Sequence, residues 1–159
     1  MSTTSPVASI DFTNLTDNCS RYLVEICDLT TDTDGAELWL RFAENGNWIN
    51  SAIYAYAWFF ANSEPRSGIE RGSASYMQIL NGMRVGEGLG TAGRIDVYDP
   101  HGSSAYRRLT WDMQGANALA TARYIGAGSY TSLNPINGIR LQLSSGNIKA
   151  ATVKLYEVN

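Results

Sequence analysis

The sequence is short of the residues from which most metal and catalytic sites are built. It contains one histidine, His101, and two cysteines, Cys19 and Cys27. So few soft ligands exclude the Cys/His clusters that hold structural zinc, and we expect no bound metal. Cys27 lies in an alternating, strand-like segment and Cys19 in a turn-like one. This favours free thiols made in a reducing cytosol, with a single disulfide between them as the alternative.

Charge and long apolar runs are scarce as well. Charged residues make up 17% of the chain, and the net charge is −3. Proteins that bind nucleic acid usually carry a basic excess, so this balance argues against a general phosphate-binding role. No apolar run approaches the roughly 18 residues of a membrane-spanning helix. The N-terminus lacks the basic and apolar regions of a secretory signal. We therefore expect neither nucleic-acid binding nor membrane insertion.

The sequence is rich instead in Ser, Thr, Asn, Gly and Tyr, a composition typical of strands joined by polar turns. Apolar and polar residues alternate along most of the chain, and turn-forming segments interrupt this pattern about every 10 to 15 residues. The pattern predicts one all-β domain, an antiparallel, jelly-roll-like β-sandwich of about ten strands over residues 9–159. A polar arm at residues 1–8 is expected to precede it. Residues 113–125 are the segment for which a helix is the alternative.

One stretch fits a nucleotide-binding motif. Gly88, Gly90 and Gly93 match G-x-G-x-x-G, the fingerprint of dinucleotide-binding folds. In those folds the loop opens a helix whose N-terminus holds the pyrophosphate. Here residues 94–99 alternate like a strand and Pro100 ends the run. We interpret the glycines as a connection between two strands, with Gly93 at a strand start where a side chain would clash or a bulge is needed. No cofactor is expected.

Other chemical motifs are equally incomplete. Residues 32–35 read Asp-Thr-Asp-Gly, but an EF-hand loop would need an acidic residue at Thr30 and a glutamate at Arg41, so we interpret the segment as a turn. His101 lies in a turn with no identifiable nucleophile partner. Acidic residues at polar-facing strand positions would form a catalytic pair only if the fold brought two together. These residues are Glu25, Glu37, Asp96 and Asp112. The sequence therefore predicts a non-enzymatic protein.

Aromatic side chains are the remaining candidates for recognition. Most tryptophans and tyrosines are expected in the core. Trp39 shares its face with charged residues and Trp48 lies in a loop, so these two are expected at a surface or a subunit contact. Residues 44–51, 62–68 and 99–108 are the expected recognition loops, because loops carry variable function on a rigid sandwich. The predicted contact residues are Trp39, Trp48, Asn45, Asn47, Arg66, His101 and Tyr106.

Six segments carry a family resemblance through their order and spacing. They read IDFTNL, YLVEICDL, LWLRFAENGNWINSAIYAYAW, GRIDVYDP, YRRLTWDM and INGIRLQLSSGNIKAATVKLYEV. Over about residues 9–158 this series resembles a β-sandwich domain of tailed-phage and prophage structural proteins. The chain departs from the family pattern at turn and packing positions. Asn47 stands where the second glycine of an N-G-G hairpin would fall, Ala151 stands where a glycine is common, and Glu157 replaces a terminal glycine.

The resemblance implies a non-enzymatic virion structural protein on the particle surface, made in the cytoplasm of the host bacterium. It would be a capsid-decoration, head-fibre or tail-fibre subunit, with other virion proteins as partners and a homotrimer or another homo-oligomer as its state. Attachment is expected through the arm at residues 1–8 or through a face of the sandwich. The alternative is a host-receptor adhesin that binds a cell-surface glycan through its exposed loops. Aromatic residues gathered in a groove beside Asn or Asp would favour it.

Overall fold

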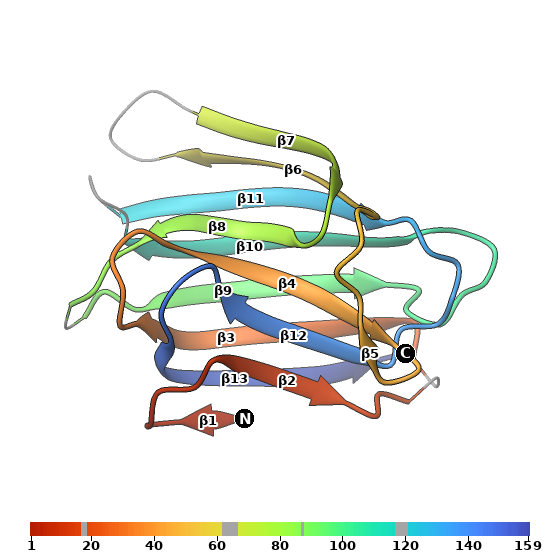
Figure 1. Ribbon diagram of the computed structural model, residues 1–159, viewed down its shortest axis with the longest axis horizontal. Helices are drawn as coiled ribbons and strands as arrows, with labels where there is room; N and C mark the ends of the chain where they lie inside the picture. The colour runs from red at the N-terminus through yellow and green to blue at the C-terminus, as the bar shows by residue number, and fades with distance from the viewer. Residues whose placement is uncertain (17–18, 62–66, 87, 117–120) are drawn as a thin grey trace.

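Antiparallel β-strands build the protein (Figure 1). The computed structural model describes residues 1–16, 19–61, 67–86, 88–116 and 121–159. Within these ranges there are thirteen strands and no helix. This confirms the all-β antiparallel sandwich predicted from the sequence.

The strands form two sheets. The larger sheet has eight strands in the order β1-β13-β3-β9-β10-β11-β6-β7. They are β1 (Ser2–Thr3), β3 (Arg21–Thr31), β6 (Tyr54–Ala61), β7 (Ser67–Ala74), β9 (Thr91–Tyr98), β10 (Arg107–Ala116), β11 (Thr121–Tyr130) and β13 (Ile148–Val158). The smaller sheet has the order β2-β12-β4-β5, and β8 also pairs with β4. Its strands are β2 (Ser9–Thr13), β4 (Ala36–Glu44), β5 (Asn47–Trp48), β8 (Met77–Met83) and β12 (Gly138–Leu143).

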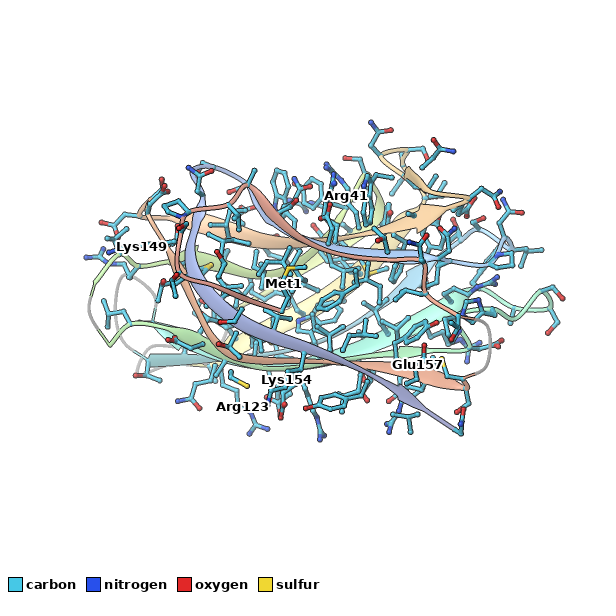
Figure 2. All side chains as sticks on the ribbon, turned by 90° about the horizontal axis from the view of Figure 1, so that it is seen from below. Met1, Arg41, Arg123, Lys149, Lys154 and Glu157 are labelled. Atoms are coloured by element: carbon cyan, nitrogen blue, oxygen red, sulfur yellow. The ribbon has the colours of Figure 1, made fainter. Side chains whose placement is uncertain are left out.

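The core lies between the two sheets. Figure 2 shows the layers from the side, with Arg41 on the outer surface of the smaller sheet and Arg123 and Lys154 on that of the larger. Alternate residues of each strand point inward, as the period-2 pattern predicts. The buried faces include Tyr22, Val24 and Ile26 of β3, Leu38, Leu40 and Phe42 of β4, and Tyr54, Tyr56 and Trp58 of β6. Each such side chain contributes about 1.5–3 kcal/mol through burial.

The structure differs from the sequence prediction in strand number and at residues 113–125. Two of the additional strands, β1 and β5, have two residues each, too few for alternation to be visible. The edge strand β7 reads SGIERGSA, which has no apolar period. The helical alternative is wrong for the described residues of this segment, 113–116 and 121–125, which belong to β10 and β11, where Met113 pairs with Tyr124. Residues 117–120 lie outside the described residues. Tertiary pairing outweighs the helix-forming alanines of that segment.

The first eight residues are not separate from the sandwich. Ser2 and Thr3 pair with Thr152 and Ala151 at the edge of β13, and Val7 forms a bridge with Ile148. The predicted polar arm is therefore partly a short edge strand. Val7 also packs against the core, so both backbone pairing and apolar contact hold the segment to the sandwich.

The glycine motif of residues 88–93 leads into β9, as expected. Gly93 has a φ of 149°, and a Cβ there would overlap the backbone of Asp112 and Met113 on β10. The glycine is needed for this close approach between strands. Gly88 has a φ of 72°, which suits a turn. The motif leads into a strand and not into a helix, whereas a dinucleotide-binding loop opens a helix whose N-terminus holds the pyrophosphate.

One end of the sandwich is held together by a buried arginine. Arg107 is 0% exposed, and its guanidinium donates hydrogen bonds to four backbone carbonyls. The acceptors are Pro100 (3.3 Å), Ala105 (2.7 Å), Ser132 (3.5 Å) and Leu133 (2.9 Å). These carbonyls belong to the β9–β10 and β11–β12 loops, so a single side chain fixes two loops against each other.

Candidate functional site

The two tryptophans predicted at the surface lie on the outer face of the smaller sheet. Trp39 stacks on Tyr76 with ring centroids 3.9 Å apart, and its indole Nε1 donates to Glu37 over 2.7 Å. The guanidinium of Arg140 lies 4.2 Å from the centre of the Trp48 ring. Both tryptophans are half-buried. Neighbours in the same chain therefore already cover part of each ring, and a subunit contact through them stays a prediction.

The predicted asparagines shape the β4–β5 turn. Asn45 and Gly46 both have positive φ, 49° and 78°, as a two-residue hairpin turn requires. The amide of Asn47 donates to the carbonyl of Asn45 over 3.3 Å. The side-chain oxygen of Asn137, from the β11–β12 loop, accepts the N–H of Gly46 over 3.1 Å. These contacts give the turn a structural explanation.

The remaining predicted residues are not gathered with the tryptophans. His101 lies in the β9–β10 loop, where its Nε2 is 2.9 Å from the Tyr22 hydroxyl. Tyr106 is 52% exposed in the same loop and lines a small hollow with Leu133. Arg66 lies outside the described residues. The described residues of the predicted set do not form one cluster, but the β4–β5 turn and the β9–β10 loop lie at the same end of the sandwich, because hydrogen bonds join the β11–β12 loop to both.

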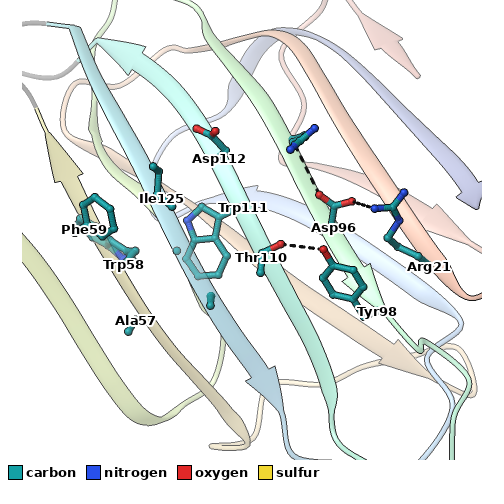
Figure 3. Close-up of a pocket in the computed structure, with 13 residues that line it drawn as sticks. Arg21, Ala57, Trp58, Phe59, Asp96, Tyr98, Thr110, Trp111, Asp112 and Ile125 are labelled. Atoms are coloured by element: carbon teal, nitrogen blue, oxygen red, sulfur yellow. Dashed lines mark hydrogen bonds and ion pairs between the residues drawn. The ribbon is translucent and has the colours of Figure 1, made fainter.

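A trough crosses the outer face of the larger sheet (Figure 3). Its floor is a row of short side chains that strand pairing places side by side on β6, β11, β10 and β9. They are Ala57, Ala127, Thr110 and Asp96. The hollow has a volume of about 710 Å³. It adjoins a second hollow of about 510 Å³ toward β7.

Longer side chains in the neighbouring rows form the two walls. One wall consists of Arg108, Tyr98 and Arg21, and the other of Phe59, Ile125, Asp112 and Arg94. Each wall lies two residues along the strands from the floor, a shift of about 7 Å. The rings of Phe59 and Tyr98 are 46% and 39% exposed. Figure 3 shows them on opposite sides of the floor.

Hydrogen bonds and ion pairs hold the polar end of the trough. The hydroxyl groups of Tyr98 and Thr110 are 3.4 Å apart. The side chain of Asp96 is only 10% exposed, and its carboxylate lies 3.0 Å from Arg21 and 3.8 Å from Arg94. Burial of a carboxylate costs free energy unless it is paired, and these two arginines are its partners. The floor is therefore a preformed surface, not a loose cluster.

The second acidic group of the trough is also paired. Asp112 accepts two hydrogen bonds from Arg123, at 2.8 and 2.5 Å. These hydrogen bonds lower the pKa of Asp112 below 3.8, so the carboxylate stays ionised at neutral pH. In contrast, no ion pair between described residues includes Arg108. Arg108 is exposed and lines the adjoining hollow.

The core beneath the floor has little spare room. Gly126 lies between Trp58 and Trp111 in the strand register. A Cβ at Gly126 would overlap the ring of Trp111 and crowd the Cβ of Trp58. The indole Nε1 atoms of both tryptophans are buried without a hydrogen-bond partner. The floor therefore rests on a tightly packed aromatic layer.

The trough is suited to binding by contact. Exposed aromatic faces stack on sugar rings or other flat groups, and the arginines and hydroxyls beside them supply hydrogen-bond donors. Of the four acidic residues singled out in the sequence, the fold brings Asp96 and Asp112 together in the trough and Glu25 and Asp112 together in a neighbouring hollow, whereas Glu37 lies on the other sheet. Each of the three on the larger sheet is paired with an arginine or a lysine. Among the described residues no group of three potential metal ligands occurs. The described part of the chain also contains no helix that could cross a membrane.

Sequence reasoning placed the residues of the trough on outward faces but did not combine them. Alternation in β6 puts Ala57 and Phe59 on one face, and alternation in β9 puts Asp96 and Tyr98 on one face. No local signal says that Ala57 and Ala127, seventy residues apart, are opposite each other. A search for strands with small outward residues would have indicated β6 and β11.

The fold and the trough define an antiparallel β-sandwich with a groove across its larger sheet. No protein-family model matches the chain, and searches of curated proteins and of solved structures gave no match.

Proposed function

We propose that this protein is a non-enzymatic structural protein on the surface of a bacteriophage particle, as a capsid-decoration, head-fibre or tail-fibre subunit. The observation that supports this most is the position of the six segments that resemble phage structural domains. They coincide with β2, β3, β4 to β6, β9, β10 and β12 to β13. The segments that carry the resemblance therefore include strands of both sheets.

Purified particles provide the test. Quantitative mass spectrometry and immunogold electron microscopy should find the protein on the particle surface, in a copy number that matches the symmetry of the head or the tail. A protein that remains in the lysate while particles lack it would contradict the proposal. Light scattering on the isolated protein then tests the homo-oligomer, since a trimer has three times the 17.4 kDa of one chain.

Attachment to the particle is proposed through residues 1–8 or a sandwich face. Residues 2 and 3 pair with β13, so removal of residues 1–8 would also uncover part of a strand edge. Loss of incorporation in a deletion variant with an unchanged thermal midpoint would support the arm as the anchor. Unchanged incorporation would indicate a sandwich face instead.

Glycan binding is the second candidate function, and the trough favours it. Two exposed aromatic rings, Phe59 and Tyr98, flank a floor with a hydroxyl and a carboxylate. This combination is common in carbohydrate sites, because a sugar ring has an apolar face and a polar edge. The groove lies on the sheet rather than in the loops where the sequence suggested looking. Substituting Tyr98→Ala should abolish binding to any glycan that an array detects.

A further inference from the structure

We propose that the trough binds an acidic polysaccharide, a polymer of sugars that bear carboxylates. Tyr98 would stack on a sugar ring, while Arg94 and Arg108 would pair with acid groups. The inference rests on the glycan-binding candidate above and adds the charge of the ligand.

The local charge of the trough supports an anionic ligand. The residues that line the trough and the adjoining hollow include four arginines and three acidic residues, which gives them a net charge of +1. The arginines are Arg21, Arg71, Arg94 and Arg108, and the acidic residues are Glu70, Asp96 and Asp112. The whole chain carries −3. Because the chain as a whole is negative, an anionic ligand is attracted by the positive charge of the trough only at short range.

Two of these arginines have donors to spare. Arg21 already holds Asp96 at 3.0 Å, and Arg123 holds Asp112. Arg94 lies 3.8 Å from Asp96 with its side chain 68% exposed, and Arg108 takes part in no ion pair between described residues. A guanidinium carries five N–H donors in a planar fork that matches a carboxylate.

The spacing of Arg94 and Arg108 suits a polymer. Arg108 is opposite Tyr98, and Arg94 is four residues further along β9. Their Cα atoms are therefore about 14 Å apart, on opposite walls of the trough. A chain with repeated acid groups can pair with both guanidinium groups at once. The exposed ring of Tyr98 lies beside Arg108, so stacking and ion pairing act on neighbouring parts of one ligand.

Binding should be measured by calorimetry with three carboxylate polymers: polygalacturonate, hyaluronate and polysialate. Each is compared with its carboxyl-reduced form, which keeps the sugar backbone and removes the charge. We expect at least one acidic polymer to bind at least about tenfold more tightly than its reduced form. Oligothymidylate serves as a polyanion without sugar carboxylates and should bind more weakly than that polymer.

Variants locate the interaction. Arg94→Gln and Arg108→Gln should each weaken binding of the acidic polymer about tenfold and leave any binding of the reduced form unchanged. Arg84→Gln makes the same change in net charge outside the trough, where Arg84 faces Asp34 at 3.6 Å, and should have no effect. Ala127→Phe fills the floor without a change in charge and should abolish binding. Unchanged thermal midpoints show that the variants fold.

Each outcome decides between the proposals. Equal binding of an acidic polymer and its reduced form would overturn the inference but sustain glycan binding. Absence of binding to all three polymers would overturn both. Equal binding of oligothymidylate, or an equal effect of Arg84→Gln, would show that the trough responds to negative charge alone. None of these results bears on the presence of the protein on particles, which is tested separately.

Discussion

The buried guanidinium of Arg107 allows a sharp test of how the sandwich is held together. Its side chain is 0% exposed, and its hydrogen-bond acceptors are carbonyls of two loops. The hydrogen bonds to Ala105 and Leu133, at 2.7 and 2.9 Å, have optimal lengths and are expected to make the main contribution to stability. The two at 3.3 and 3.5 Å are longer and contribute less. A hydrogen bond from a charged donor contributes about 1.5–3 kcal/mol. Arg107→Ala should therefore lower the free energy of unfolding by about 3–5 kcal/mol.

The next residue provides a matched control. Arg108→Ala removes the same side chain from an exposed position without an ion pair, so its effect should stay within about 0.5 kcal/mol. Chemical denaturation followed by tryptophan fluorescence measures both values. The thermal midpoint of Arg107→Ala should fall by roughly 6–20 °C, given about 2–4 °C per kcal/mol for a chain of this size. A loss below about 1 kcal/mol, or equal losses for the two variants, would refute the assigned role of Arg107.

Three further perturbations test other parts of the structure. Gly126→Ala should destabilise the protein by about 1–3 kcal/mol in denaturant unfolding, because its Cβ overlaps Trp111, whereas Gly72→Ala, which meets nothing within 4 Å, should be nearly neutral. Burial acts to raise the pKa of Glu44, but hydrogen bonds from Ser132, Tyr130 and Asn134 outweigh it and lower that pKa below 4.5. A carboxylate with a lowered pKa stabilises the fold above pH 4.5, and this contribution is lost as the pH falls through the folded-state pKa. Glu44→Gln lacks the contribution, so its thermal midpoint should decline less on acidification than that of the parent protein. Burial raises the pKa of Tyr56 to about 12, whereas the phenol of the unfolded chain ionises near pH 10. The free energy of unfolding should therefore fall above pH 10, and it should fall less steeply in Tyr56→Phe. Equal slopes above pH 10 in the two proteins would contradict this.

The sequence predicted which face of each strand is buried, but not how the strands combine. Alternation is local, so it indicated which residues of β3, β4 and β6 share a face. The trough depends on the register between β6, β11, β10 and β9, which tertiary packing sets. The sequence suggested the loops as the recognition site instead, because loops carry variable function on a rigid sandwich.

Arg107 shows a second limit of sequence reasoning. Alternation places it on the inward side with Leu109 and Trp111, so its burial was implicit in the pattern. Its partners are backbone carbonyls, which every residue possesses, and no residue type marks them in a sequence. For Asn45 and Asn47 the sequence does not distinguish a role in recognition from a role in the turn, because asparagine is favoured in both.

The row of short side chains on β6, β11 and β10 has a consequence for how this protein can change over generations. Ala57, Ala127 and Thr110 face outward, while the next residue along each strand faces the core. Substitutions in the row alter the depth and chemistry of the trough and leave the packing between the sheets in place. Selection could therefore exchange one ligand for another through a few point mutations, without insertions in the loops and with little loss of stability. A surface of this kind lets a binding preference drift rapidly on an unchanging frame.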